Sequence, residues 1–124
     1  QTRGREEVER PMKKVAFENI KKLGTPPKHF NVVSGRFQGA AETGLTKFWM
    51  GMSHYLPGGG VEFSGADSAE DKVYFILEGE LTVKTETEEF VLKQWDSLYI
   101  GPHEAREIIN NTSRPATMLV VVNT

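Results

Sequence analysis

The sequence predicts a single all-β domain that closes into a barrel or a sandwich. Short segments rich in β-branched and aromatic residues recur from Phe30 onward, and turn-forming or charged clusters separate them. Spacings of about 8 to 12 residues between such segments are typical of barrels and sandwiches. No long amphipathic helix is visible, which argues against an α/β fold. A chain of 124 residues is long enough to close one hydrophobic core.

The beginning of the chain differs from the rest. Residues 1–11 are polar and charged without apolar periodicity, so we expect an extension, disordered or artificial in origin, before a single domain over 12–124. Apolar residues at 15–17 and 20–23 predict a short strand or one turn of helix. Gly24-Thr25-Pro26-Pro27 then interrupts the chain.

Eight strands are expected after this break. Between two of them, Glu78-Gly79-Glu80 predicts a turn, because glycine adopts positive φ at little cost. The expected strands cover residues 30–33, 46–56, 73–77, 81–83, 90–92, 97–100, 107–109 and 117–122.

Two separated motifs resemble those of a known family. The first combines Pro57-Gly58-Gly59-Gly60 with the run from Val73 to Leu81, and the second runs from Trp95 to Asn110. Their order and spacing resemble the two signature motifs of the cupin superfamily, over roughly residues 45–123. The resemblance implies the fold of that superfamily, a double-stranded β-helix barrel.

The metal-binding positions of both motifs hold other residues. In cupins two histidines and a glutamate come from the first motif, and a further histidine comes from the second. Counting back from Gly79 places Lys72 at the glutamate position, and the histidine positions hold Ala66, Ser68 and Arg106. None of these four offers an imidazole or a carboxylate. We therefore predict a protein that binds no metal and needs no cofactor.

The amino-acid composition argues against nucleic acid and membranes as partners. The net charge of -2 and the pI of about 5.9 give no basic surface for nucleic acid. Without cysteine the chain has no disulfide and no thiolate chemistry, which is compatible with a reducing cytoplasm, where we expect the protein. No apolar run reaches the ~18 residues that a membrane span needs, so no membrane partner is expected.

Side-chain alternation assigns residues to the inside of the barrel. If Lys72 points inward, Tyr74 and Ile76 do so too, and Arg106 and Ile108 share the inner face of a later strand. On the strand before them we expect the more apolar face to point inward. That face consists of Phe48, Met50, Met52, His54 and Leu56.

Two cations at positions that normally converge on one metal predict an anion site. Burying two like charges together is costly unless an anion lies between them. The Arg106 guanidinium offers a fork that suits a carboxylate, and the Lys72 ammonium offers a point charge. The expected ligand is a small organic acid, or an enolate formed from one.

This reasoning predicts lyase, isomerase or decarboxylase chemistry through an enolate. His54 would act as the general base, and an alternative use of Lys72 is a Schiff base with a carbonyl substrate. The residues assigned to catalysis are His54, Lys72 and Tyr74, and those assigned to substrate binding are Arg106, Lys72, Met52 and Tyr99.

Two other functions stay open. For Arg106 alone, the alternative role is that of a structural ion-pair partner of Glu104, Glu107 or Asp67. For the whole protein, one open function is a ligand-binding or sensing domain without catalysis. The other is a metal enzyme with displaced ligands, drawn from His54, Glu62, Asp67, His103 and Glu107.

The remaining predictions concern the surface. We expect His29 and His103 to be surface residues. A barrel this small should expose strand edges, and the apolar segments 118–122 and 15–23 could cover them in a partner. We therefore expect a homodimer.

Overall fold

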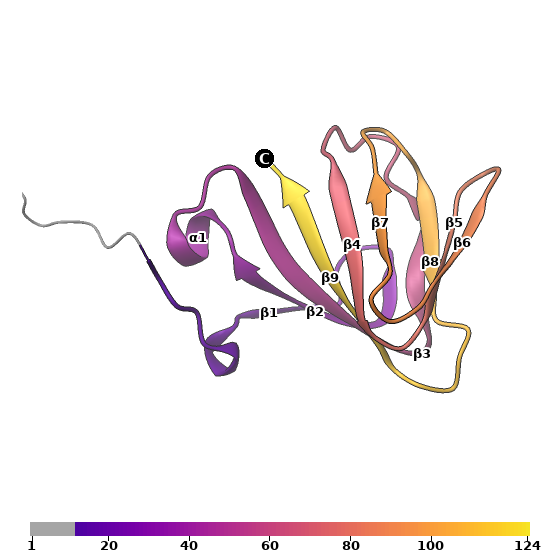
Figure 1. Cartoon of the computed structure of the whole chain (residues 1–124), viewed down its shortest axis with the longest axis horizontal. Helices are drawn as coiled ribbons and strands as arrows, with labels where there is room; N and C mark the ends of the chain where they lie inside the picture. The colour runs from indigo at the N-terminus through magenta and orange to yellow at the C-terminus, as the bar shows by residue number, and fades with distance from the viewer. Residues whose placement is uncertain (1–11) are drawn as a thin grey trace, which may run out of the picture.

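The structure, a computed structural model, describes residues 12–124. Within that range the chain forms a nearly closed barrel of antiparallel strands (Figure 1), as the sequence predicted. The extension predicted over residues 1–11 lies outside the described residues. No helix in the described range is long and apolar enough to cross a membrane.

All eight predicted strands are present, and a further short strand precedes them. Six match the prediction to within one residue at their ends, whereas the strands predicted over 30–33 and 46–56 extend well beyond their predicted C-terminal ends, to Gln38 and Ser64. The regular helical structure between residues 12 and 124 consists of a 3-10 turn over Phe17–Asn19 and one short α-helix, α1 (Ala40–Thr43). The strands are β1 (Lys22–Gly24), β2 (His29–Gln38), β3 (Phe48–Ser64), β4 (Lys72–Glu78), β5 (Leu81–Lys84), β6 (Glu89–Leu92), β7 (Ser97–Ile100), β8 (Arg106–Ile109) and β9 (Ala116–Asn123).

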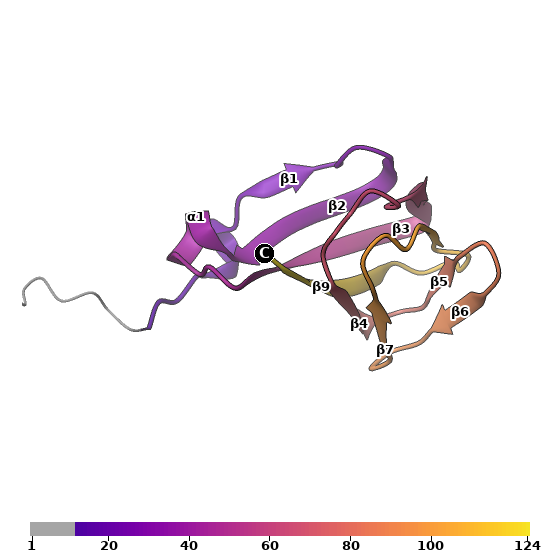
Figure 2. The same ribbon diagram turned by 90° about the horizontal axis from the view of Figure 1, so that it is seen from above.

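The long strand β3 organises the sheet, whose order is β6-β5-β8-β3-β9-β4-β7. One edge of β3 pairs with β2, and its other edge pairs first with β9 and then with β8. Strand β4 joins the sheet on the far side of β9. The sheet curves round from β3 and β9 towards β5 and β6 (Figure 2). Residues of β4 and β8 line the same interior.

A packed core fills part of this interior. The residues Ile76, Leu81, Val83 and Ile108 are almost completely buried. Asn110, in the second motif, is also buried, and its amide nitrogen donates to the backbone oxygens of Tyr55 and Arg114. Its amide oxygen accepts from the backbone nitrogen and the hydroxyl of Thr112. With both donors and both lone pairs used, Asn110 fixes the β8–β9 turn against β3.

The apolar C-terminal strand, which we expected to cover a strand edge of a partner, lies in the middle of the sheet. β9 pairs with β3 on one side and β4 on the other, so its apolar residues pack within the barrel and cannot cover an edge of a partner. The prediction that this segment covers a strand edge of a partner was wrong, because a continuous apolar run also suits a strand with neighbours on both sides.

The turn at Gly79 yields a prediction about stability. Gly79 has a φ of 81°, and a Cβ there would lie 2.5 Å from the backbone oxygen of Pro115. Gly58 has the same φ of 81°, but a Cβ there would meet no atom within 4 Å. We expect Gly79→Ala to lower the free energy of unfolding by about 1–3 kcal/mol more than Gly58→Ala does. Urea denaturation measures both, and equal losses would contradict the close approach.

Candidate functional site

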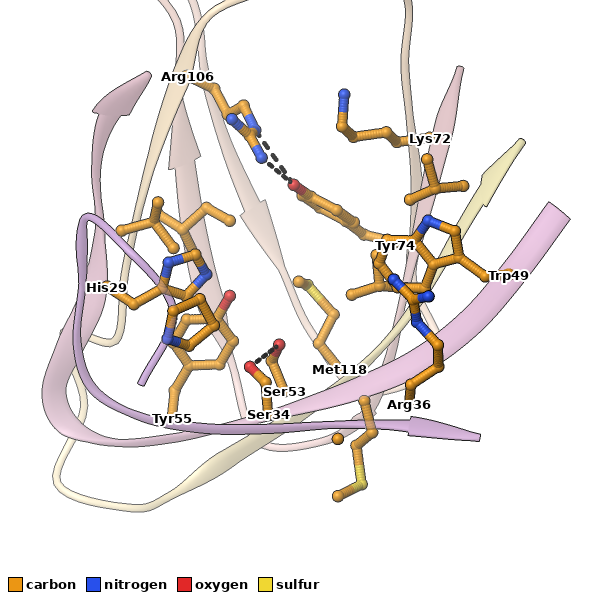
Figure 3. Close-up of a pocket in the computed structure, with 17 residues that line it drawn as sticks. His29, Ser34, Arg36, Trp49, Ser53, Tyr55, Lys72, Tyr74, Arg106 and Met118 are labelled. Atoms are coloured by element: carbon orange, nitrogen blue, oxygen red, sulfur yellow. Dashed lines mark hydrogen bonds between the residues drawn. The ribbon is translucent and has the colours of Figure 1, made fainter. Parts of the chain in front are cut away.

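A cavity of about 320 Å³ opens inside the barrel (Figure 3), within the usual size range of small-molecule sites. Side chains from β2, β3, β4, β8 and β9 form its walls. Three of the lining residues are cationic, and none is aspartate or glutamate. The lining residues are Pro26, His29, Ser34, Gly35, Arg36, Trp49, Met52, Ser53, Tyr55, Val61, Lys72, Tyr74, Arg106, Ile108, Met118, Val120 and Val122.

Arg106 is held by neutral partners. Its Nε and Nη2 donate to the Tyr74 hydroxyl at 3.1 and 2.7 Å, and its Nη1 donates to the backbone oxygen of Ser64 at 2.9 Å. Among the described residues no carboxylate is within ion-pair distance of the guanidinium, so the expected alternative partners Glu104 and Glu107 do not neutralise it. Arg106 therefore brings an uncompensated positive charge to the cavity.

Lys72 brings a second charge to the same cavity. Its Nζ donates to Ser68 Oγ at 2.5 Å, and that hydroxyl donates to Glu70 Oε1 at 2.7 Å. Burial lowers the pKa of the Lys72 ammonium, and the nearby Arg106 lowers it further, while Glu70 and Asp71 act in the opposite direction. Lys72 and Arg106 line the same cavity, so their like charges repel one another there.

The Tyr74 hydroxyl completes this arrangement. Burial raises its pKa, and the charge and hydrogen bonds of Arg106 only partly offset the increase. Because both contacts from Arg106 are donated to the phenol oxygen, the phenol proton is free to point elsewhere. Tyr74 thus remains protonated at neutral pH and can donate to a ligand oxygen beside Arg106.

The face of β3 that points inward is the opposite of the one predicted. Phe48 and Leu56 are 39% and 44% exposed, whereas Tyr55 is 1% exposed. Trp49, Ser53 and Tyr55 line the cavity. The prediction failed because it assumed a solid apolar interior, whereas this part of the barrel is hollow and its two serines satisfy each other through the 3.0 Å contact between Ser34 and Ser53.

His54 consequently lies outside the cavity. Its Nδ1 is 2.9 Å from the hydroxyl of Thr117 on the neighbouring strand β9. Its predicted inward position is wrong, and the geometry gives it no contact with a ligand in the cavity. Met52, which shares that face, does border the cavity.

Tyr99 also lies outside. Strand β7 pairs Ile100 with Lys72 and Leu98 with Tyr74, so these residues share the inner face and Tyr99 takes the outer one. It is 62% exposed, and its hydroxyl donates to Asp71 Oδ1 at 2.6 Å. Strand alternation alone could have excluded it from substrate binding.

Several cavity residues were not selected from the sequence. Arg36 lies over the ring of Trp49, 4.4 Å from the ring centre, and adds a third cation. Tyr55 is buried, which raises the pKa of its phenol. His29, expected on the surface, is partly exposed and also lines the cavity. No motif marks these residues, although β2 pairs with β3 along most of its length and so delivers its inward side chains to the same space.

A metal of the kind that the motifs imply does not fit these residues. Two of the four inherited positions hold the cations Lys72 and Arg106, which would repel a metal ion. Within residues 12–124, no three histidine, cysteine, aspartate or glutamate side chains gather in a way that could hold a metal ion. The displaced-ligand alternative therefore has no cluster of ligands in the described structure.

Comparisons with known proteins place the chain in a family. The family model for the Cupin domain matches residues 51–122. A β-D-galactosidase from Mycobacterium tuberculosis is 41% identical over 96 residues, which cover 77% of this chain and 81% of the relative. The chain therefore belongs to the cupin family.

Solved structures agree on the fold. The polyketide cyclase RemF from Streptomyces resistomycificus superposes with a TM-score of 0.77 at 15% identity, covering 90% of this chain and 79% of that one. A sugar phosphate isomerase of the cupin superfamily from Silicibacter pomeroyi superposes with a TM-score of 0.74 at 20% identity, covering 90% of this chain and 76% of that one. At these identities the likeness concerns the fold alone.

The environment of Lys72 yields a prediction about pH. A lysine whose pKa is lowered by folding costs stability while it is charged, and the cost disappears above its ordinary pKa. Arg106, Tyr74, Glu70 and Asp71 surround it. We expect Lys72→Met to have an equal or higher free energy of unfolding than the unmutated chain at about pH 7, and the advantage to shrink towards about pH 10 to 11.

Urea denaturation at both pH values measures this difference. Lys93→Met is the matched control, because Lys93 is exposed and distant from the cavity lining. An advantage of Lys72→Met that grows with rising pH would contradict the lowered pKa.

Proposed function

We propose that the cavity binds a small organic carboxylate and promotes lyase, isomerase or decarboxylase chemistry on it without a metal. The observation that supports this proposal is the charge of the lining: Lys72, Arg106 and Arg36 are cationic, and no aspartate or glutamate is among the lining residues. A carboxylate ligand would lower the electrostatic cost of holding these charges together.

The groups around Arg106 suit a reaction that generates negative charge on oxygen. Arg106 and Lys72 can bind the carboxylate of the acid. The Tyr74 phenol, kept protonated by burial, can donate to the adjacent carbonyl or hydroxyl oxygen. When a proton or carbon dioxide leaves the neighbouring carbon, the electron pair moves onto that oxygen, where these preorganised donors stabilise the enolate.

Hydrolysis of β-galactosides is a second candidate, which the 41% identity with the mycobacterial β-D-galactosidase favours. Ser34, Ser53, Tyr55 and Trp49 would suit the hydroxyls and the ring of a sugar. Against it, glycoside hydrolysis ordinarily uses two carboxylates, and the cavity lining of the described structure contains none. Sugar acids carry both a carboxylate for the cations and hydroxyls for the polar lining residues, so the panel of test ligands includes them.

Ligand binding tests the proposal. The panel contains pyruvate, 2-oxobutanoate, D-glycerate and D-galacturonate, with methyl pyruvate and D-galactose as neutral counterparts. We expect one or more acids to raise the melting temperature of the protein, and the neutral counterparts to have no effect. If no acid raises it, or the neutral compounds act equally well, the proposal is wrong.

Variants locate the binding site. Lys72→Met and Arg106→Leu should each weaken carboxylate affinity by about 10- to 100-fold, because each removes one charged hydrogen-bond donor. Lys93→Met and His54→Ala, which alter residues outside the cavity, should leave the affinity unchanged. Isothermal titration calorimetry measures all four. β-Galactoside hydrolysis would be favoured if the protein released nitrophenol from a nitrophenyl β-D-galactoside and Arg106→Leu were as active as the unmutated protein.

A domain that binds the acid without transforming it is supported by the same contacts. Substrate turnover by the unmutated protein distinguishes an enzyme from such a binding domain.

The homodimer also stays a proposal. It is supported by exposed apolar side chains on β2 and β3, including Val33 and Leu56. Light scattering at working concentration should give twice the chain mass, and a monomer would contradict it. The cytoplasmic location stays a prediction.

A further inference from the structure

We infer that His29 is the general base of this cavity and removes a proton from the carbon next to the carbonyl of the bound acid. This inference rests on the proposed function. The chain has three histidines. His54 contacts Thr117 on the outside of the barrel, and His103 is exposed. Only His29 of the three lines the cavity.

The position of His29 is fixed by its backbone. It begins β2, its N–H donates to the backbone oxygen of Pro26 at 3.1 Å, and it pairs in register with Val61 of β3. The preceding residue, Lys28, has a φ of 64°, and its backbone oxygen accepts from Glu62 N–H. This turn directs the imidazole towards the cavity, beside Tyr55 (Figure 3).

A contact with the backbone determines which ring nitrogen carries the proton. The Nδ1 atom of His29 is 2.9 Å from the backbone oxygen of Pro27. A carbonyl oxygen can only accept, so Nδ1 is the donor and carries the proton. In the neutral ring Nε2 then has its lone pair free, and within residues 12–124 no side chain or backbone group is hydrogen-bonded to it.

The other cavity groups are poorer bases. Burial raises the pKa of the Tyr74 and Tyr55 phenols, so both keep their protons. The Lys72 ammonium has no lone pair with which to accept a proton. Figure 3 shows His29 on the opposite side of the view from Lys72 and Tyr74. An acid whose oxygens are bound by the cations would lie between these walls.

The proton transfer balances without a further reactant. The C–H bond beside the carbonyl breaks and its electron pair forms the C=C bond of the enolate, while the carbonyl π pair moves onto oxygen. The proton bonds to Nε2, and the resulting imidazolium still donates through Nδ1 to the Pro27 carbonyl. Return of a proton to the same carbon exchanges it with solvent, and return to another carbon of the conjugated system gives an isomer.

Hydrogen exchange tests this step directly. Pyruvate and 2-oxobutanoate are incubated with the protein in deuterated water, and the loss of their C3 proton signals is followed by NMR. His29→Asn is the informative variant, because the asparagine amide can replace the Nδ1 donor to Pro27 but provides no base. His103→Asn is its matched control, since His103 Nδ1 is likewise 3.0 Å from a carbonyl oxygen, that of Ala66, outside the cavity.

We expect the unmutated protein and His103→Asn to exchange these protons at equal rates above the buffer rate. His29→Asn should lower the rate by about 100-fold or more, with the dissociation constant of the acid changed by less than about threefold. Exogenous imidazole should partly restore exchange in His29→Ala. Exchange that survives in His29→Asn, or no exchange although an acid binds, overturns this inference alone. If none of the acids binds, both the inference and the proposed function fail.

Discussion

The contact between the Arg106 guanidinium and the Tyr74 phenol determines how the rest of the cavity is arranged. It ties β8 to β4 across the barrel, and it keeps a full positive charge in the interior without a carboxylate to neutralise it. Burial, and after it this charge, lowers the pKa of Lys72. The direction of the hydrogen bonds leaves the phenol proton available for a ligand. The affinity for anions that we propose for the cavity rests on this contact, in which neutral groups hold a cation.

The motifs allowed the fold to be predicted closely because they combine spacing with backbone requirements. Gly79 is needed for its positive φ, and Asn110 for four hydrogen bonds, and both lie where the family pattern expects them. The positions of Lys72 and Arg106 followed from the same spacing, since two residues at positions that normally bind one metal must face one interior.

The inward residues of β2 and β3 could not be predicted in this way, because their identity depends on the barrel interior being partly hollow. Apolar residues were assigned to the inside of β3, as in a solid core, but Trp49, Ser53 and Tyr55 line a hollow there. His29 gave no signal in the sequence, because a histidine after Pro26-Pro27-Lys28 looks like any loop residue until its strand is paired with β3. Tyr99 was different: the alternation of β7 already placed it outside.

The division of the barrel into a packed part and a hollow part bears on how such a protein can evolve. Ile76, Leu81, Val83 and Ala116 belong to the buried core but do not line the cavity. Ser34, Arg36, Trp49 and Ser53 line the cavity but do not belong to that core. Substitutions in the second group can alter ligand preference while the first group retains the free energy of folding. Relatives of this chain can therefore acquire different substrates through few changes, without first gaining extra stability.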